Sequence, residues 1–193
     1  MAQCVGLTIL AWDIAQLPIL RDLIQHDQVR HHHPDLLRRT LDSIACVEHP
    51  GGLERIYVIE NGPRAGADTV CKDYLGRLPL VYIYEETPGL SNARNVGATH
   101  ATSPILLFID DDIRMLRDTL SSYDDAFQRH GPTCFFGGPL TPDYETQPEP
   151  FLVEFLPCSA KGPSLGEKEI DVGQPLFLGG NIAEYRLRFG KTG

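Results

Sequence analysis

The chain has 193 residues, 42% of them hydrophobic, and a formal net charge of −9. This composition suits one globular domain and argues against extended nucleic-acid binding, which needs a basic surface. No apolar run reaches the roughly 18 residues that span a bilayer. The five cysteines are scattered without a C-x-x-C pair. We therefore expect a cytoplasmic protein with reduced thiols, and a peripheral position at the inner membrane face is left open.

Apolar runs alternate with amphipathic segments through the first 130 residues. The runs predict strands at 5–12, 55–62, 80–86 and 105–110. The segments between and after these runs predict helices at 33–47, 65–78, 89–101 and 115–130, and a broken helical pattern at 14–29. Residues 134–140 suggest one more strand, and residues 139–175, rich in Pro and Gly, predict a long irregular region. Alternation of this kind predicts an α/β fold with a mostly parallel sheet and helices on both faces.

Polar residues follow each predicted strand. The first strand is followed by Asp13, the second by Glu60 and Asn61, the third by residues 85–86 and the fourth by residues 110–112. Parallel strands end at the same edge of a sheet, and ligands of open α/β sheets bind there. The sequence therefore predicts a polar, acidic binding site at the carboxyl edge.

The run Asp110, Asp111 and Asp112 directly follows the apolar strand "ILLFI". Adjacent carboxylates repel near a low-dielectric core unless a cation, water or a helix terminus compensates them. Strand alternation predicts that Asp110 and Asp112 face one side and Asp111 the other. A divalent cation such as Mg²⁺ or Mn²⁺ is one explanation; capping of the following helix by solvated acids is the other.

The segment "TPGLSNARNVGA", residues 87–98, contributes hydrogen-bond donors. Ser91 is the expected N-cap of its helix, and Arg94 and Asn95 follow in the first turns. Exposed amides at a helix start attract anions, and Arg94 could balance phosphate charge. An ordinary capped helix with a surface arginine remains the alternative.

Three segments occur in the order typical of one family: "IYVIENGP", "ETPGLSNARNVGATHATSPILLFIDDDIRM" and "FLGGNIAEYR". From about residue 55 to 186 the chain resembles the family 2 glycosyltransferases, with weaker similarity at "LTILAWD" and "LLRRTLDSI". The resemblance implies a GT-A-type, Rossmann-like fold. It also implies one domain over 1–193, with a nucleotide-binding half at 1–130 and an incomplete acceptor-side half at 131–193.

The resemblance further implies transfer of a sugar, with inversion, from a nucleotide diphosphate sugar, most often a UDP-sugar, to a glycan or lipid-linked acceptor hydroxyl. It implies Mn²⁺ or Mg²⁺ held at a DXD-type motif by Asp112 and Asp110. The residues that match donor- or acceptor-side positions of the family are Asp13, Glu60, Asn61, Arg94, Asn95, Asp110, Asp111, Gly180 and Asn181.

The family normally continues beyond the Gly-Gly-Asn segment to a Gly-Gly-Phe-type segment and a helix with an acidic base, and "RLRFGKTG" matches neither. We therefore expect a C-terminally truncated chain, and the catalytic base stays unassigned. A nucleotide-sugar-binding domain without turnover and a nucleotidyltransferase are the alternatives, although the latter would need a Gly-rich first loop. A phosphatase with Asp110 as nucleophile also fits the local motif, but not its place at the fourth strand.

Overall fold

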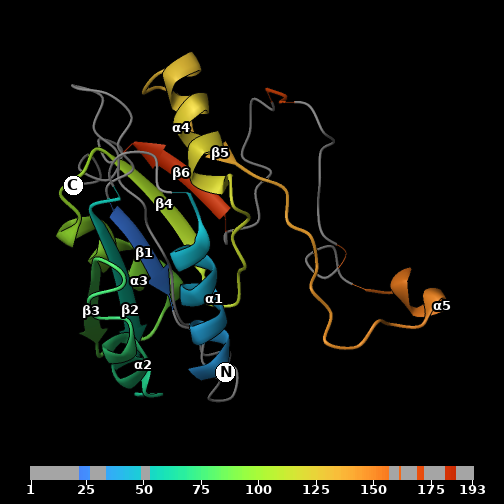
Figure 1. The fold of residues 1–193 in the computed structure, drawn as a ribbon, viewed down its shortest axis with the longest axis horizontal. Helices are drawn as coiled ribbons and strands as arrows, with labels where there is room; N and C mark the ends of the chain where they lie inside the picture. The colour runs from blue at the N-terminus through green and yellow to red at the C-terminus, as the bar shows by residue number, and fades with distance from the viewer. Residues whose placement is uncertain are drawn as a thin grey trace.

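One mixed sheet forms the centre of the protein (Figure 1). The structure is a computed structural model and describes residues 22–26, 34–48, 53–156, 161, 169–171 and 181–185. Its strands lie in the order β3-β2-β1-β4-β6-β5. The first four in this order are parallel, and β6 runs antiparallel to β4 and β5. Their bounds are β1 Asp22–His26, β2 Arg55–Asn61, β3 Leu80–Glu85, β4 Ile105–Asp110, β5 Phe136–Gly137 and β6 Asn181–Tyr185.

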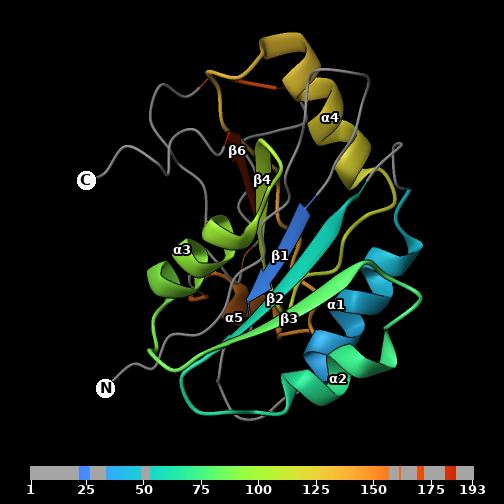
Figure 2. The same cartoon turned by 90° about the vertical axis from the view of Figure 1, so that its left-hand side faces the viewer.

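Helices cover both faces of this sheet, as Figure 2 shows with the sheet between α3 and the other long helices. Their bounds are α1 Pro34–Cys46, α2 Ala67–Asp73, α3 Leu90–His100, α4 Thr119–His130 and α5 Pro150–Val153. None of the helices in the described ranges is long and apolar enough to cross a membrane. The arrangement is the expected α/β fold.

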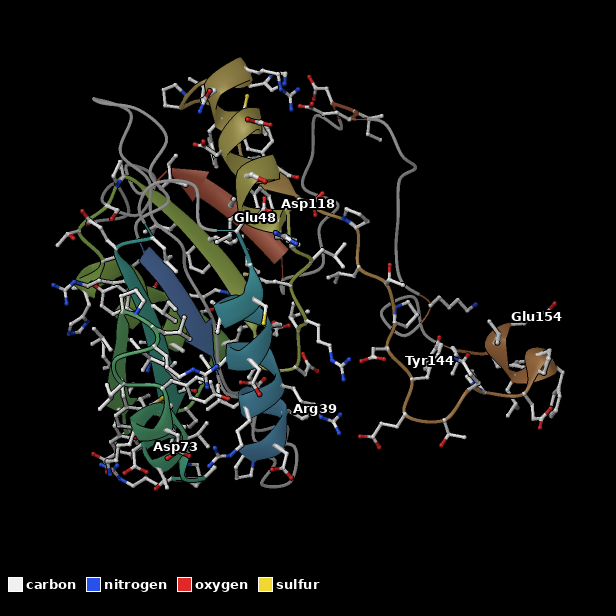
Figure 3. All side chains as sticks on the ribbon, viewed as in Figure 1. Arg39, Glu48, Asp73, Asp118, Tyr144 and Glu154 are labelled. Atoms are coloured by element: carbon white, nitrogen blue, oxygen red, sulfur yellow. The ribbon has the colours of Figure 1, made fainter. Side chains whose placement is uncertain are left out.

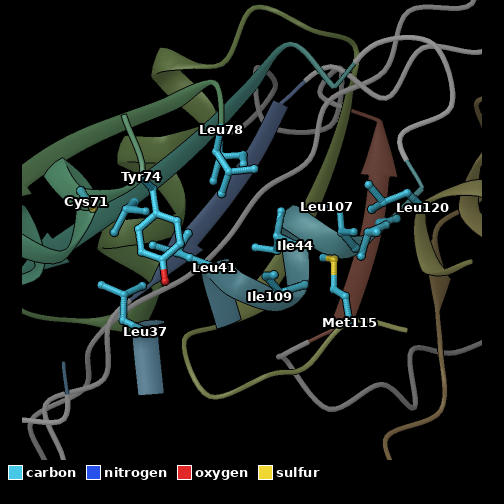
Figure 4. Packing of buried hydrophobic residues seen from close by; sticks show 14 of the residues in the cluster. Leu37, Leu41, Ile44, Cys71, Tyr74, Leu78, Leu107, Ile109, Met115 and Leu120 are labelled. Atoms are coloured by element: carbon cyan, nitrogen blue, oxygen red, sulfur yellow. The ribbon is translucent and has the colours of Figure 1, made fainter. Parts of the chain in front are cut away.

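Alternate residues of β4 supply the two halves of the core. Ile105, Leu107 and Ile109 belong to one buried cluster with α1, α2 and α4, part of which is seen in Figure 4. Leu106 and Phe108 belong to the other cluster, under α3. A strand buried on both faces needs apolar residues throughout, which explains the continuous run "ILLFI".

Most predicted helices and strands are confirmed with ends that differ by no more than four residues, whereas α2 ends five residues before the predicted end at 78. The prediction for 14–29 is wrong over Asp22–His26, which forms β1 rather than helix. Here the short run "DLI" is placed between β2 and β4, and this tertiary pairing overrides the helical pattern. The strand predicted at 5–12 lies outside the described residues.

Two helix starts also differ from the prediction. The N-cap of α3 is Gly89, with φ of 134°, so Ser91 lies inside the first turn instead of capping it. Helix α4 begins at Thr119 rather than 115, because Met115 is drawn into the core against other elements.

The segment after β5 leaves the sheet and carries α5 at its far end (Figure 1). Near its start, Asp143 pairs with Arg114 at 3.2 Å and Glu145 pairs with Arg39 at 3.5 Å. Figure 3 shows Arg39 projecting from α1 on the side where this segment and Tyr144 lie. Residues 139–149 are irregular, as predicted, and the short helix α5 was not predicted.

Candidate functional site

The carboxyl ends of the parallel strands meet at one edge, as the sequence predicted for 60–62, 85–86 and 110–112. Asn61 of β2 is the Cα partner of Glu85 in β3. His26, the last residue of β1, is the partner of Asp110 in β4. Because β6 runs antiparallel, its first residue Asn181 also lies at this edge, opposite Ile109. The fold thus gathers five chain segments around the end of β4.

Asp110 is an acid of this edge whose pKa is strongly raised. Its pKa is raised from 3.8 to about 6: burial is the main cause, the nearby charge of Asp112 adds to it, and Arg94 acts in the opposite direction. A carboxylate that is partly buried beside another carboxylate is stabilised by any added cation.

Asp111 is the buried member of the acidic run. It is buried, with 4% of its surface exposed, and its carbonyl oxygen accepts a hydrogen bond from Thr40 Oγ1 of α1 at 2.5 Å. The acidic run does not cap α4, since residues 113–118 separate Asp112 from the first helical residue, Thr119. The helix-capping explanation of the acidic run is therefore excluded by the structure.

Helix α3 presents Arg94 and Asn95 near the same edge. Arg94 lies with its guanidinium carbon 5.8 Å from the ring centre of Phe108, the residue two positions before Asp110. Its charge lowers the pKa of Asp110. Asn95 is exposed on the helix surface. The guanidinium of Arg94, next to the carboxylates, gives this edge a positive group that can bind an anionic ligand such as a phosphate.

Glu60 is wholly buried and bonds within the protein. Its Oε1 accepts hydrogen bonds from the amides at the start of α2, at 3.0 Å from Gly66 and 3.5 Å from Ala67, and also from Ala65. Its Oε2 accepts one from the hydroxyl of Tyr82. The negative charge therefore lies at the positive end of α2, a task that the sequence did not reveal.

Asn61 holds the loop that leads into α3. Its Nδ2 donates to the carbonyl oxygens of Thr87 at 3.3 Å and Gly89 at 2.9 Å. Asn92 Nδ2 donates to the same Thr87 oxygen at 2.8 Å. The buried amide of Asn61 thereby fixes the loop that precedes Arg94.

Three predicted positions have no side-chain description. Asp13 and Gly180 lie outside the described residues, and Asn181 is placed by its backbone alone. Sequence reasoning also missed Thr40 and Ser43, which contact the loop after β4. A signal existed for Thr40: it is a polar residue on the face of α1 that otherwise buries Leu37, Leu41 and Ile44.

The chemistry of this edge fits a hard divalent cation. Within the described residues no group of three or more His, Cys, Asp or Glu side chains is arranged to hold a metal. Mg²⁺ and Mn²⁺ commonly bind through one or two carboxylates together with phosphates of the substrate. Asp110 and Asp112 supply such a pair, so the ion would need the ligand to complete its coordination.

Comparison with known proteins agrees with this geometry. The family model described as Glycosyl transferase family 2 matches residues 30–181, a range that runs from just before α1 to the first residue of β6. No curated protein matches the chain. Because the match spans most of the chain and includes the whole acidic edge, the protein belongs to glycosyltransferase family 2.

Proposed function

We propose that the protein transfers a sugar from a nucleotide diphosphate sugar to an acceptor hydroxyl, with the diphosphate held at the end of β4. The observation that carries the proposal is the position of Asp110, partly buried at the carboxyl end of β4 and two residues before Asp112; its raised pKa agrees with this position. Such a pair opposes folding unless a cation is bound, so its place at the ligand edge of a family 2 fold supports a metal–diphosphate site.

Each residue of the edge has a task in this proposal. Asp110 and Asp112 hold Mn²⁺ or Mg²⁺, which when bound neutralises charge on the leaving diphosphate. Arg94 contributes a second positive charge toward the phosphates. Asn95 is proposed to contact the donor, and the buried Asp111 is proposed to do so through its backbone.

The remaining predicted residues are proposed to bind the donor and the acceptor on either side of the metal pair. The ends of β1 and β2 are proposed to receive the nucleoside, with Glu60 and Asn61 fixing the backbone around it. Gly180 and Asn181 are proposed for the sugar and acceptor side, which agrees with the position of Asn181 opposite Ile109. UDP-sugars are the proposed donors, and a glycan or a lipid-linked glycan is the proposed acceptor.

Calorimetric titration of UDP with and without Mn²⁺ tests the donor site. The wild-type protein is expected to bind UDP only when Mn²⁺ is present, and the double variant Asp110→Ala/Asp112→Ala is expected to lose this binding. Asp125→Ala is the matched control, because Asp125 is an exposed acid on α4 away from the edge. Failure of UDP, GDP and TDP alike to bind with metal would refute the proposed site.

Turnover separates the enzyme from a binding domain. Incubation with UDP-sugars and Mn²⁺ is expected to release UDP slowly by hydrolysis and faster when a suitable acceptor is added. Tight metal-dependent binding with no UDP release, across donors and acceptors, would favour the alternative of a nucleotide-sugar-binding domain.

A further inference from the structure

The loop that follows β4, residues 111–118, is fastened to one side of α1. Four hydrogen bonds or ion pairs link the loop to α1 and to Glu48 just beyond it. The loop includes Asp112, so whatever fixes the loop also limits where Asp112, one of the two proposed metal ligands, can point.

Thr40 makes the first attachment. Its side chain is 1% exposed, and its hydroxyl lies 2.5 Å from the carbonyl oxygen of Asp111. The carbonyl oxygen of Leu36, one turn earlier in α1, is 3.2 Å away. A hydroxyl has a single proton, and the shorter distance assigns that proton to Asp111. The peptide between Asp111 and Asp112 is thereby held against α1.

Ser43 makes the second attachment, almost one turn further along α1. Its hydroxyl donates to the carbonyl oxygen of Thr40 at 2.7 Å and accepts from the amide of Met115 at 3.1 Å. Met115 itself is 8% exposed and lies in the core cluster with Ile44 and Leu107 (Figure 4). The serine thus anchors the loop three residues after Asp112.

A third attachment closes the far end of the loop. The amide of Glu48 donates to the carbonyl oxygen of Arg117 at 3.0 Å, and Arg117 Nε donates to Glu48 Oε1 at 2.7 Å. The side chains of this ion pair are 58% and 79% exposed, so it contributes little by itself. Figure 3 shows Glu48 near Asp118, where the loop passes into α4.

We propose that Thr40 and Ser43 are positioning residues for the pair Asp110 and Asp112, a proposal that rests on the metal–diphosphate site above. Asp110 is fixed from behind as the last residue of β4, and Asp112 is fixed from both sides by the bonds at Asp111 and Met115. Two repelling carboxylates would otherwise separate when no cation is present. Groups that hold metal ligands in place typically contribute about 10- to 100-fold to metal affinity.

The test compares Thr40→Val with Thr40→Ser in the full chain. Valine keeps the shape of threonine and removes the donor, whereas serine keeps the donor. Calorimetry of UDP binding with Mn²⁺ and the electron paramagnetic resonance spectrum of bound Mn²⁺ are measured for each variant. Thr40→Val is expected to weaken Mn²⁺-dependent UDP binding about tenfold and to change the spectrum, while Thr40→Ser retains wild-type behaviour.

Tyr74→Phe is the matched control. Tyr74 is buried, and its hydroxyl donates to the carbonyl oxygen of Arg38 at 3.0 Å, so its loss loosens α1 where it meets the end of α2 without removing a bond to the loop. It is expected to lower the melting temperature without changing Mn²⁺-dependent binding. An equal loss of binding in Tyr74→Phe would show that general loosening of α1 is the cause and would overturn the proposal.

Ser43→Ala tests the proposal independently if Thr40→Val does not fold. It is expected to speed hydrogen exchange at the Met115 amide in metal-free protein and to weaken Mn²⁺-dependent UDP binding. Wild-type affinity in both Thr40→Val and Ser43→Ala would overturn the proposal while leaving the metal site intact. Absence of metal-dependent binding in the wild-type protein would overturn the metal site, and the positioning role with it.

Discussion

The carboxylate of Glu60 accepts a hydrogen bond from the hydroxyl of Tyr82 on the neighbouring strand. Its other oxygen caps the start of α2 through Gly66 and the adjacent amides. Burial and the hydrogen bond from Tyr82 to Glu60 both raise the pKa of the tyrosine, so the phenol stays protonated and remains a donor. One buried acid therefore joins β2, β3 and α2 immediately behind the ligand edge.

We expect Glu60→Gln to lower the free energy of unfolding by about 1–2 kcal/mol, because the charge at the start of α2 is lost and one amide hydrogen must face Tyr82. Urea denaturation at pH 7 measures the change. Glu85→Gln is the control: Glu85 accepts a hydrogen bond from the Thr87 amide at 2.8 Å at the same edge but is only partly buried, so its effect should be smaller. Equal stability of Glu60→Gln and wild type would contradict the capping role.

Asp110→Asn is expected to stabilise the metal-free protein while abolishing metal-dependent nucleotide binding. The folded-state pKa of Asp110, about 6, exceeds its ordinary value of 3.8. The folded protein therefore holds this proton more tightly than the unfolded chain, and the contribution of Asp110 to stability falls as pH rises from about 4 to 6. Above pH 6 the ionised carboxylate costs about 1–3 kcal/mol, which asparagine avoids.

Thermal or urea unfolding in EDTA at several pH values checks this prediction. The variant should be more stable than wild type at pH 7.5, and the difference should shrink toward pH 4. Asp125→Asn on the surface of α4 should show no such pH dependence. A variant less stable than wild type at pH 7.5 would mean that the carboxylate of Asp110 contributes to the fold.

Arg94→Met is expected to raise the pKa of Asp110 above its present value of about 6, because the arginine is the group that lowers it. Methionine keeps much of the length and apolar contact of the side chain beside Phe108. Carboxyl NMR titration of metal-free protein measures the shift. An unchanged Asp110 pKa would show that Arg94 does not act on the carboxylate in solution.

Gly62→Ala is expected to destabilise the protein more than Gly76→Ala. Both glycines have positive φ, 83° and 87° respectively, so alanine strains the backbone at each. At Gly62 an added Cβ would also lie 3.2 Å from Cβ of Pro88, whereas at Gly76 nothing lies within 4 Å. The strain alone should cost about 1 kcal/mol, and the extra contact should add to it at Gly62.

Urea denaturation of both variants measures their free energies of unfolding, and the difference between them gives the cost of the contact between the added Cβ and Pro88. Since Pro88 belongs to the loop before α3, Gly62→Ala should also weaken nucleotide binding with Mn²⁺, and Gly76→Ala should not. Equal stability of the two variants would show that the loop of Pro88 gives way without cost.

The sequence predicted those helices and strands whose hydrophobic pattern can be recognised within the element itself. The apolar runs of β2, β3 and β4 and the amphipathic face of α1 each identify their structure without knowledge of neighbours. Alternation of these elements was enough to predict the parallel sheet, and the polar residues after each strand were enough to predict its ligand edge. The sequence could predict a candidate site because strand ends in a parallel sheet meet at one edge by geometry.

Tertiary structure alone decided the features that depend on contacts between residues far apart in the sequence. The strand β1 has a short apolar core, and it forms because β2 and β4 offer it hydrogen bonds on both sides. Likewise, nothing near Glu60 in the sequence shows that Tyr82 and α2 will share its carboxylate. The same holds for Thr40, which is separated from Asp111 by 71 positions and meets it only when α1 packs on the sheet. Local pattern thus determined the layers and the acidic edge, whereas long-range packing determined which polar groups hold that edge in place.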